Sequence, residues 1–297
     1  MAEPGLILVD WGTSRRRAWL VTRDGETLDR REDEAGMLSL PPDGFAPSFD
    51  GLAAGWPACP VLLAGMVGAR QGWVEAPYLD CPTTLSGLAE RLTPVPGRDH
   101  AWIVPGLRYR DGAGGIDVLR GEEVQVCGTL ASAQAFDLLI LPGTHCKWVE
   151  IDVGRVISFR TYMTGEFYDL LMKHGSIGRA ADGQRDDAAA YETGLRLGGA
   201  TGDTLGRLFA VRAACVGGDL VPASVAAMLS GLLIGREVAD ALDGSHPTGR
   251  VAIIGRGDLA RQYRLALENR GIDAAVIDGE IARDGLLAIA RERGMLR

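Results

Sequence analysis

The chain has 297 residues, of which 46% are hydrophobic and 24% charged, as in ordinary globular proteins. Its net charge of −8 and its pI of about 5.1 provide no basic field that would favour nucleic acid or an anionic membrane. The five cysteines are scattered without a CxxC pair, which argues against a disulfide framework or a zinc site. The N-terminus lacks signal-peptide features, and no apolar stretch is long enough to cross a membrane, so we expect a cytoplasmic protein.

The first half of the chain predicts a sheet that begins with a β-meander. Two apolar runs and a third, weakly alternating segment are joined by short turns, one of them Asp24-Gly25, which is the pattern of consecutive antiparallel strands. Helices are expected within 43–56, at 84–92 and from near Asp117, and strands at 6–10, 16–23, 26–33, 59–68 and 101–107.

The second half predicts the same order of elements again. Three strands are expected at 136–143, 147–153 and 156–166, and helices within 166–243; strands at 250–257 and 273–279 then each precede a helix. The repeat indicates a duplicated α/β fold. We expect lobes at 1–130 and 131–297, with the last helix able to pack back on the N-terminal lobe.

The stretch "DWGTS" places a carboxylate, Asp10, at the end of an apolar strand and small residues directly after it. The backbone around Gly12 and the hydroxyls of Thr13 and Ser14 can cradle a phosphate. A carboxylate in the same turn would repel bare phosphate, so it implies a divalent cation between them. An ordinary hairpin capped by Asp10 is the equally weighted alternative.

The stretch "LPGTHCKW" repeats this device after another apolar strand. Gly143, Thr144 and His145 form the second turn, and Lys147 follows. Two such turns at matching positions of a duplication favour a phosphate clamp, although His145 could simply satisfy its own turn. A third glycine turn, "IIGRGDLA", lies between a strand and a helix, where Gly255 and Gly257 would let a ribose or a flat ring approach the backbone.

The stretch "LRGEEVQVCG" places Glu122 and Glu123 in a helix. Paired acids at a helix start are often only favourable partners of the helix dipole, but one facing a cleft could accept a hydroxyl proton. Two further strand ends, "AGMVGARQGWVEAPY" and "FRTYMTGEF", carry more polar and small residues than structure requires. Their Arg70 or Arg160 could pair with a substrate carboxylate, with ordinary surface ion pairs as the alternative.

These motifs, in this order from about residue 6 to beyond 290, closely resemble the 2-dehydro-3-deoxygalactonokinase family. The family belongs to the actin/hexokinase/Hsp70 ATPase superfamily. The resemblance implies a duplicated actin-like, ribonuclease H-like fold, with two lobes around a nucleotide cleft. It also implies ATP-dependent phosphorylation of the 6-hydroxyl of 2-dehydro-3-deoxy-D-galactonate in galactonate catabolism, with Mg²⁺ as the cofactor of ATP.

The resemblance also assigns roles to residues. "DWGTS" and "PGTHCKW" resemble the two phosphate loops and "IIGRGDLA" the adenosine loop, while Asp10 would hold the hydrated metal ion. The proton acceptor stays open among Glu122, Glu123 and Asp10. The expected ATP-binding residues are Gly12, Thr13, Ser14, Gly143, Thr144, His145, Lys147, Gly255, Gly257 and Leu259. The expected substrate-binding residues are Arg16, Gly65, Met66, Val67, Trp73, Arg160, Thr164 and Glu166.

Several other functions compete with this one. The chain could phosphorylate another keto-deoxy sugar acid, such as the gluconate epimer, or be a phosphatase or ATP hydrolase on the same fold. A non-catalytic, sugar-responsive protein is a further alternative. A nicotinamide-dependent oxidoreductase is disfavoured because the first strand returns as a strand where that fold needs a helix. We expect a small-molecule sugar acid as partner, neither nucleic acid nor membrane, and a homodimer as one option.

Overall fold

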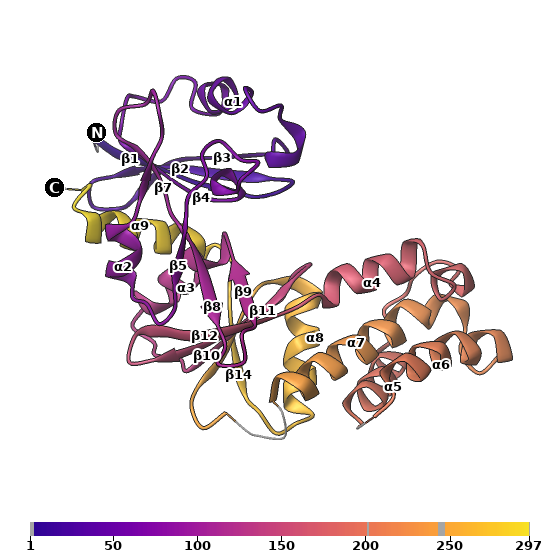
Figure 1. Ribbon diagram of the computed structural model, residues 1–297. Helices are drawn as coiled ribbons and strands as arrows, with labels where there is room; N and C mark the ends of the chain where they lie inside the picture. The colour runs from indigo at the N-terminus through magenta and orange to yellow at the C-terminus, as the bar shows by residue number, and fades with distance from the viewer. Residues whose placement is uncertain (1–2, 201, 243–246, 297) are drawn as a thin grey trace. The chain divides into compact units, whose positions relative to one another are not determined.

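The structure is a computed structural model that describes residues 3–200, 202–242 and 247–296 (Figure 1). The chain divides into two compact units, each of which is described separately. The first comprises Met1–Phe136, Glu150–Phe159 and Gly279–Arg297, and the second comprises Asp137–Val149 and Arg160–Asp278. Within the described ranges, no helix is both long and apolar enough to span a bilayer.

The main sheet of the first unit has six strands in the order β3-β2-β1-β4-β7-β6. Strands β1, β2 and β3 are antiparallel, which confirms the predicted meander, and β4 and β7 join β1 in parallel. Gly25 turns the chain between β2 and β3 with a φ of 92° that favours glycine. The strands are β1 (Pro4–Trp11), β2 (Arg16–Thr22), β3 (Thr27–Asp33), β4 (Val61–Gly65), β6 (Thr93–Pro94) and β7 (Ala101–Ile103).

A three-stranded sheet, β5-β8-β9, and several helices complete this unit. Its strands are β5 (Tyr78–Asp80), β8 (Gly106–Arg110) and β9 (Ile116–Leu119). The helices are α1 (Phe45–Leu52), α2 (Leu85–Glu90), α3 (Glu122–Leu130) and α9 (Ile281–Arg293), with 3₁₀ turns η1 (Met37–Ser39) and η2 (Met66–Gly68).

Two predicted elements in this region were wrong. The helix expected from near Asp117 begins at Glu122, because Ile116–Leu119 pairs with β8 as a strand and Gly121, at a φ of 103°, separates strand from helix. The single strand expected at 101–107 is two strands in different sheets: β7 pairs with β4, and β8 pairs with β5 and β9. Pro105, which lacks a backbone N–H, lies between them.

Helices α3 and α9 approach each other at two glycines. A Cβ on Gly285 would collide with the carbonyl oxygen of Val124, and one on Gly128 would collide with that of Ile281. The two backbones can therefore touch only because neither position carries a side chain. Figure 1 draws α9, in yellow, beside α2 and α3.

The second half of the chain builds a five-stranded sheet in the order β12-β11-β10-β13-β14. This order repeats β3-β2-β1-β4-β7, and β10, β13 and β14 are parallel, as are β1, β4 and β7. The predicted duplication is thus confirmed. The strands are β10 (Leu138–Leu141), β11 (Cys146–Asp152), β12 (Arg155–Tyr162), β13 (Val251–Ile254) and β14 (Ala274–Ile277).

Helices make up most of the second unit. Helix α7 is at its core: Leu229 and Leu232 are fully buried, and α5 packs closely along it at glycines such as Gly194. Asp187 and Asp203 cap α5 and α6 by accepting backbone N–H groups. The helices are α4 (Thr164–Lys173), α5 (Ala188–Gly199), α6 (Thr204–Gly217), α7 (Val225–Leu242) and α8 (Gly257–Glu268), with 3₁₀ turns η3 (Gly178–Ala180) and η4 (Pro222–Ser224).

Candidate functional site

Asp10 lies where the parallel strands β1 and β4 end together. Asp10 pairs with Ala64 and Trp11 pairs with Gly65, so the carboxylate stands beside the turn that follows β4. Gly65 has a φ of 93°, and a Cβ there would lie 2.7 Å from the carbonyl oxygen of Trp11 and 3.5 Å from Asp10 Oδ1. The close approach of these two strand ends therefore requires a glycine.

The turn after Asp10 is anchored through its backbone. Met37 donates its N–H to the carbonyl oxygen of Gly12 at 3.0 Å, and Leu38 donates to that of Thr13 at 3.1 Å. The side chains of Thr13 and Ser14 are exposed. The turn is thus fixed at its carbonyl groups, while its hydroxyls remain accessible to an anion.

The three arginines after this turn have different partners. Arg15 is exposed and lies 3.5 Å from Glu34, whereas Arg16 is buried and donates to both carboxylate oxygens of Asp33 at 2.7 and 2.9 Å. Arg17 donates to Asp10 Oδ2 at 2.6 Å and to Glu280 Oε1 at 2.9 Å. The arginine predicted to bind substrate, Arg16, is therefore committed to an ion pair in this structure.

Asp10 is suited to hold a hydrated cation. Arg17 occupies Oδ2, and within the described residues no hydrogen bond to Oδ1 is found. Mg²⁺ usually keeps several waters and takes one or two protein carboxylates together with phosphate oxygens. No cluster of three metal-ligating side chains occurs in the described part of the chain. The residues present thus fit a hydrated Mg²⁺ shared with a polyphosphate and not an all-protein cage.

The start of α3 lies beside the same turn. A Cβ on Gly121 would lie 3.5 Å from the Cα of Gly65. One carboxylate oxygen of Glu122 accepts the backbone N–H of Arg120 at 3.1 Å, and one of Glu123 accepts that of Gly121 at 2.5 Å. The structure therefore brings Asp10, the turn after β4 and both glutamates to one end of the first unit's sheet.

The two glutamates differ in burial. Glu123 is fully buried, and among the described residues its Oε1 finds no hydrogen-bond partner. Burial, and after it the charge of Glu122, raises the pKa of Glu123 to about 8. A carboxyl with this pKa is mostly protonated near neutral pH, and full burial keeps it from a ligand, so Glu123 is poorly suited to accept a proton from one.

The residues between β4 and β5, 66–77, belong to the stretch that was predicted to bind substrate and form a single compact loop. Trp73 donates its backbone N–H to the carbonyl oxygen of Val67 at 2.8 Å, and its ring packs edge-on against Trp11 at 6.4 Å between centroids. Met66 and Val67 form η2, directly after Gly65. Arg70 is exposed on this loop.

In the second unit, the turn at 143–145 lies against the first turn of α4. Glu166 donates its N–H to the carbonyl oxygen of Thr144 at 2.9 Å, and its side chain hydrogen-bonds His145 Nε2 at 2.6 Å. A Cβ on Gly165 would collide with the carbonyl oxygen of Gly143. Met163 precedes α4 and does not cap it through its side chain, so this residue leaves the first N–H groups of the helix without a side-chain acceptor.

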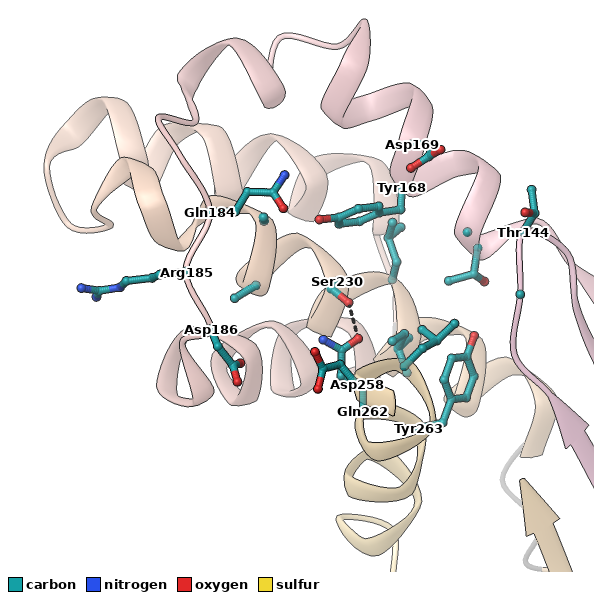
Figure 2. Close-up of a pocket in the computed structure, with 18 residues that line it drawn as sticks. Thr144, Tyr168, Asp169, Gln184, Arg185, Asp186, Ser230, Asp258, Gln262 and Tyr263 are labelled. Atoms are coloured by element: carbon teal, nitrogen blue, oxygen red, sulfur yellow. Dashed lines mark hydrogen bonds between the residues drawn. The ribbon is translucent and has the colours of Figure 1, made fainter. Parts of the chain in front are cut away.

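A cavity of about 560 Å³ opens beside this turn, lined by α4, α7, α8 and the segment before α5. In Figure 2, Tyr168 and Gln184 lie on one side of it, and Asp258, Gln262 and Tyr263 on the other. Ser230 Oγ donates to Gln262 Oε1 at 3.0 Å. Of the predicted residues, Gly143, Thr144, Thr164 and Leu259 line the cavity.

The glycine turn between β13 and α8 brings α8 to this cavity. Gly255 donates its N–H to the carbonyl oxygen of Ile277 at 2.9 Å, and Gly257 has a φ of 68° at the first residue of α8. The positive φ of Gly257 favours glycine in this strand-to-helix turn, whereas a Cβ on Gly255 would make only ordinary contacts. Leu259, two residues later, then faces the cavity.

Comparison with known proteins identifies the family. The sequence profile of the 2-keto-3-deoxy-galactonokinase family matches residues 10–289. The chain belongs to this family. It is 39% identical over 289 residues to the 2-dehydro-3-deoxygalactonokinase of Escherichia coli (strain K12), which covers 96% of this chain and 97% of that one.

Solved structures agree with this membership. A crystal structure from Sinorhizobium meliloti, assigned as a 2-dehydro-3-deoxygalactonokinase, matches with a TM-score of 0.90 at 39% identity, covering 96% of this chain and 98% of that chain. The activator of 2-hydroxyisocaproyl-CoA dehydratase from Clostridium difficile matches with a TM-score of 0.52 at 12% identity, covering 97% and 96% of the two chains. The predicted fold class, the actin-like ATPase and sugar-kinase fold, is confirmed.

Among the ligand residues predicted for this galactonokinase family member, Lys147 and Arg160 do not line the cavity. Lys147 is buried on β11, only 5% exposed. Arg160 donates to the hydroxyl of Tyr162 at 3.2 Å and to the carbonyl oxygen of Asp240 at 3.4 Å.

Arg120 contacts the predicted substrate loop of this galactonokinase family member but was not predicted from the sequence as a site residue. Its Nη2 donates to the carbonyl oxygen of Ala76 at 2.6 Å, and its guanidinium lies 4.4 Å from the ring centroid of Tyr78. Arg120 thereby holds the far end of the predicted substrate loop. The only sequence signal was its position directly before the "GEE" motif.

Proposed function

We propose that this protein transfers the γ-phosphoryl group of ATP to the 6-hydroxyl of 2-dehydro-3-deoxy-D-galactonate. The observation that carries the proposal is the family match over residues 10–289, together with 39% identity to the Escherichia coli enzyme of that name over nearly the full length of both chains.

The nucleoside of ATP is assigned to the cavity of the second unit. Its volume of about 560 Å³ is in the ordinary range for small-molecule sites, and Leu259 with the α8 turn borders it. The phosphates are assigned to the turns at 12–14 and 143–145, with His145 held by Glu166. The N-terminus of α4 beside the second turn favours negative charge, which supports this placement.

Mg²⁺ is assigned to Asp10. Arg17 pairs with Oδ2 of this carboxylate, so Oδ1 is the oxygen assigned to the ion. The ion would supply charge neutralisation of the ATP phosphates. The chain's own contribution is to hold Asp10 in place through Arg17, which Glu280 in turn orients.

The proton acceptor is assigned to Glu122. The acceptor hydroxyl loses its proton to a carboxylate as its oxygen forms the new bond to phosphorus and ADP leaves. Glu123 is disfavoured because it is fully buried, and Asp10 because Arg17 engages it and it is assigned to the metal ion. Glu122→Gln should lower turnover at least about 100-fold while ATP binding is retained. Turnover within a few-fold of the wild type would remove Glu122 from this role.

A coupled assay of ADP release tests the function. With ATP and Mg²⁺, we expect release that depends on added 2-dehydro-3-deoxy-D-galactonate and is slower with the gluconate epimer. Faster release with the epimer would assign the chain to that sugar acid instead, since single hydrogen bonds decide such choices. Equal release without any sugar acid would favour an ATP hydrolase and contradict the proposal.

We place the protein in the cytoplasm, which supplies ATP and a reducing environment. All five cysteines carry free thiols, which fits that environment. A homodimer is the assembly that we propose to test, by sedimentation at micromolar concentration, and a monomer there would reject it.

A further inference from the structure

Helix α7 carries a charged side chain in its buried face. Glu237 is only 2% exposed and lies among the residues of an apolar cluster that includes Ile234, Val238 and Leu242. An isolated carboxylate at such a place costs several kcal/mol in lost hydration unless hydrogen bonds replace the water. The roles assigned above to the nucleotide site do not use this residue.

Two hydrogen-bond donors and two further polar side chains converge on the Glu237 carboxylate. Trp148 Nε1 donates to Oε1 at 2.7 Å, and the Tyr263 hydroxyl donates to Oε2 at 2.6 Å. The side chains of Cys146 and Thr164 interact with it as well. Burial raises the pKa of Glu237, and these four side chains oppose that rise.

The partners of Glu237 belong to the elements that form the candidate nucleotide site. Thr164 is the first residue of α4 and lines the cavity, as does Tyr263 of α8. Cys146 directly follows His145 at the end of the second turn. Figure 2 shows Tyr263 with α8 at the edge of the cavity. A single buried carboxylate on α7 therefore reaches β11, α4 and α8 at once.

We propose that Glu237 is a positioning residue of the nucleotide site, which fixes the start of α4, the second phosphate turn and Tyr263 relative to one another. It does not touch the ligand. This inference rests on the proposed assignment of ATP to the cavity and the turn at 143–145.

The replacement Glu237→Gln keeps the shape of the side chain but changes one acceptor oxygen into an NH₂ donor. The indole N–H of Trp148 can only donate, so it takes the remaining oxygen. The NH₂ group then faces Tyr263, whose hydroxyl loses its carboxylate acceptor and has to reorient to accept from the amide. The cavity wall becomes less well defined, and ATP binding must order it.

We expect Glu237→Gln to raise the KM for ATP and its calorimetric dissociation constant by about tenfold, in line with the loss of one hydrogen bond to a charged group. The KM for the sugar acid should stay unchanged. Glu192→Gln makes the same chemical change at an exposed position of α5 and should leave both constants unaltered. Tyr263→Phe, which removes one of the two hydrogen-bond donors, should raise the KM for ATP in the same direction by about threefold.

A structural role alone would lower the melting temperature and the active fraction but would leave the KM for ATP at the wild-type value. That result would overturn the inference, as would an ATP constant that changes no more than in Glu192→Gln. If Glu237→Gln does not fold, the KM for ATP of Tyr263→Phe is the deciding measurement, and a wild-type value there would overturn the inference. Wild-type protein that binds no ATP would refute the proposed function itself and this inference with it, so the two failures are distinguishable.

Discussion

Replacing Glu123 by Gln should remove a pH dependence of stability. The carboxyl of Glu123 ordinarily has a pKa of 4.5, and in the folded protein burial raises this pKa to about 8. Its contribution to stability is therefore fully present below pH 4.5 and is lost as the pH rises through 8, since the unfolded chain releases the proton first. At 1.36 kcal/mol per pKa unit, this corresponds to a decline in the unfolding free energy of about 2 kcal/mol between roughly pH 6 and 8.

Urea unfolding at several pH values measures this decline. Gln at position 123 resembles the protonated carboxyl, because its oxygen can accept the Gly121 N–H and its amide replaces the unpartnered Oε1. We expect the variant to match the wild type below pH 4.5, and its stability advantage to be about 2 kcal/mol larger near pH 8 than near pH 6. Glu90→Gln makes the same change at an exposed position of α2 and is the matched control.

Parallel pH profiles for the wild type and Glu123→Gln would refute this reasoning. They would mean that Glu123 is ionised in the folded protein at pH 7. Its charge state would then no longer disfavour Glu123 as the proton acceptor.

Three other replacements test the sites separately. Asp10→Asn should keep the fold but lower Mg²⁺-dependent turnover at least about 100-fold in the ADP-release assay; an unchanged Mg²⁺ dependence would remove Asp10 from the metal site. Glu166→Ala should free the His145 ring and lower kcat by about tenfold to a hundredfold, and a wild-type kcat would show that their hydrogen bond is dispensable. Gly285→Ala should force a Cβ against the Val124 carbonyl and lower the free energy of unfolding by about 2 kcal/mol in urea; equal stability would contradict the close helix approach.

The repeated strand order could be predicted because it rests on local patterns. The Asp24-Gly25 turn and the alternation around it define the meander, and glycine turns end β4, β10 and β13. The strand at Ile116–Leu119 could not be separated from the helix that follows it. Its four residues are too few to distinguish a period of two from one of 3.6, and its pairing with β8 depends on tertiary structure.

The site residues could be predicted as motifs but not as partners. Arg17 reaches Glu280, which lies 263 residues away in the sequence, and no local pattern contains that ion pair. The burial of Arg16 with Asp33 likewise follows from the register of β2 with β3. Glu237 was visible only as a charge that interrupts an apolar segment, and its hydrogen-bond donors Trp148 and Tyr263 come from other elements of the fold.

The packing of α9 on α3 has a consequence for synthesis on the ribosome. The first unit includes Gly279–Arg297 as well as the N-terminal residues up to Phe136, so it is assembled from both ends of the chain. The backbone contact of Gly285 with Val124 cannot form until the last helix has emerged. All of the second unit, which ends at Asp278, is synthesised before that helix is complete. We therefore expect the unit that begins synthesis first to finish folding last, and the growing chain to keep the α9-binding face of α3 uncovered for most of its synthesis.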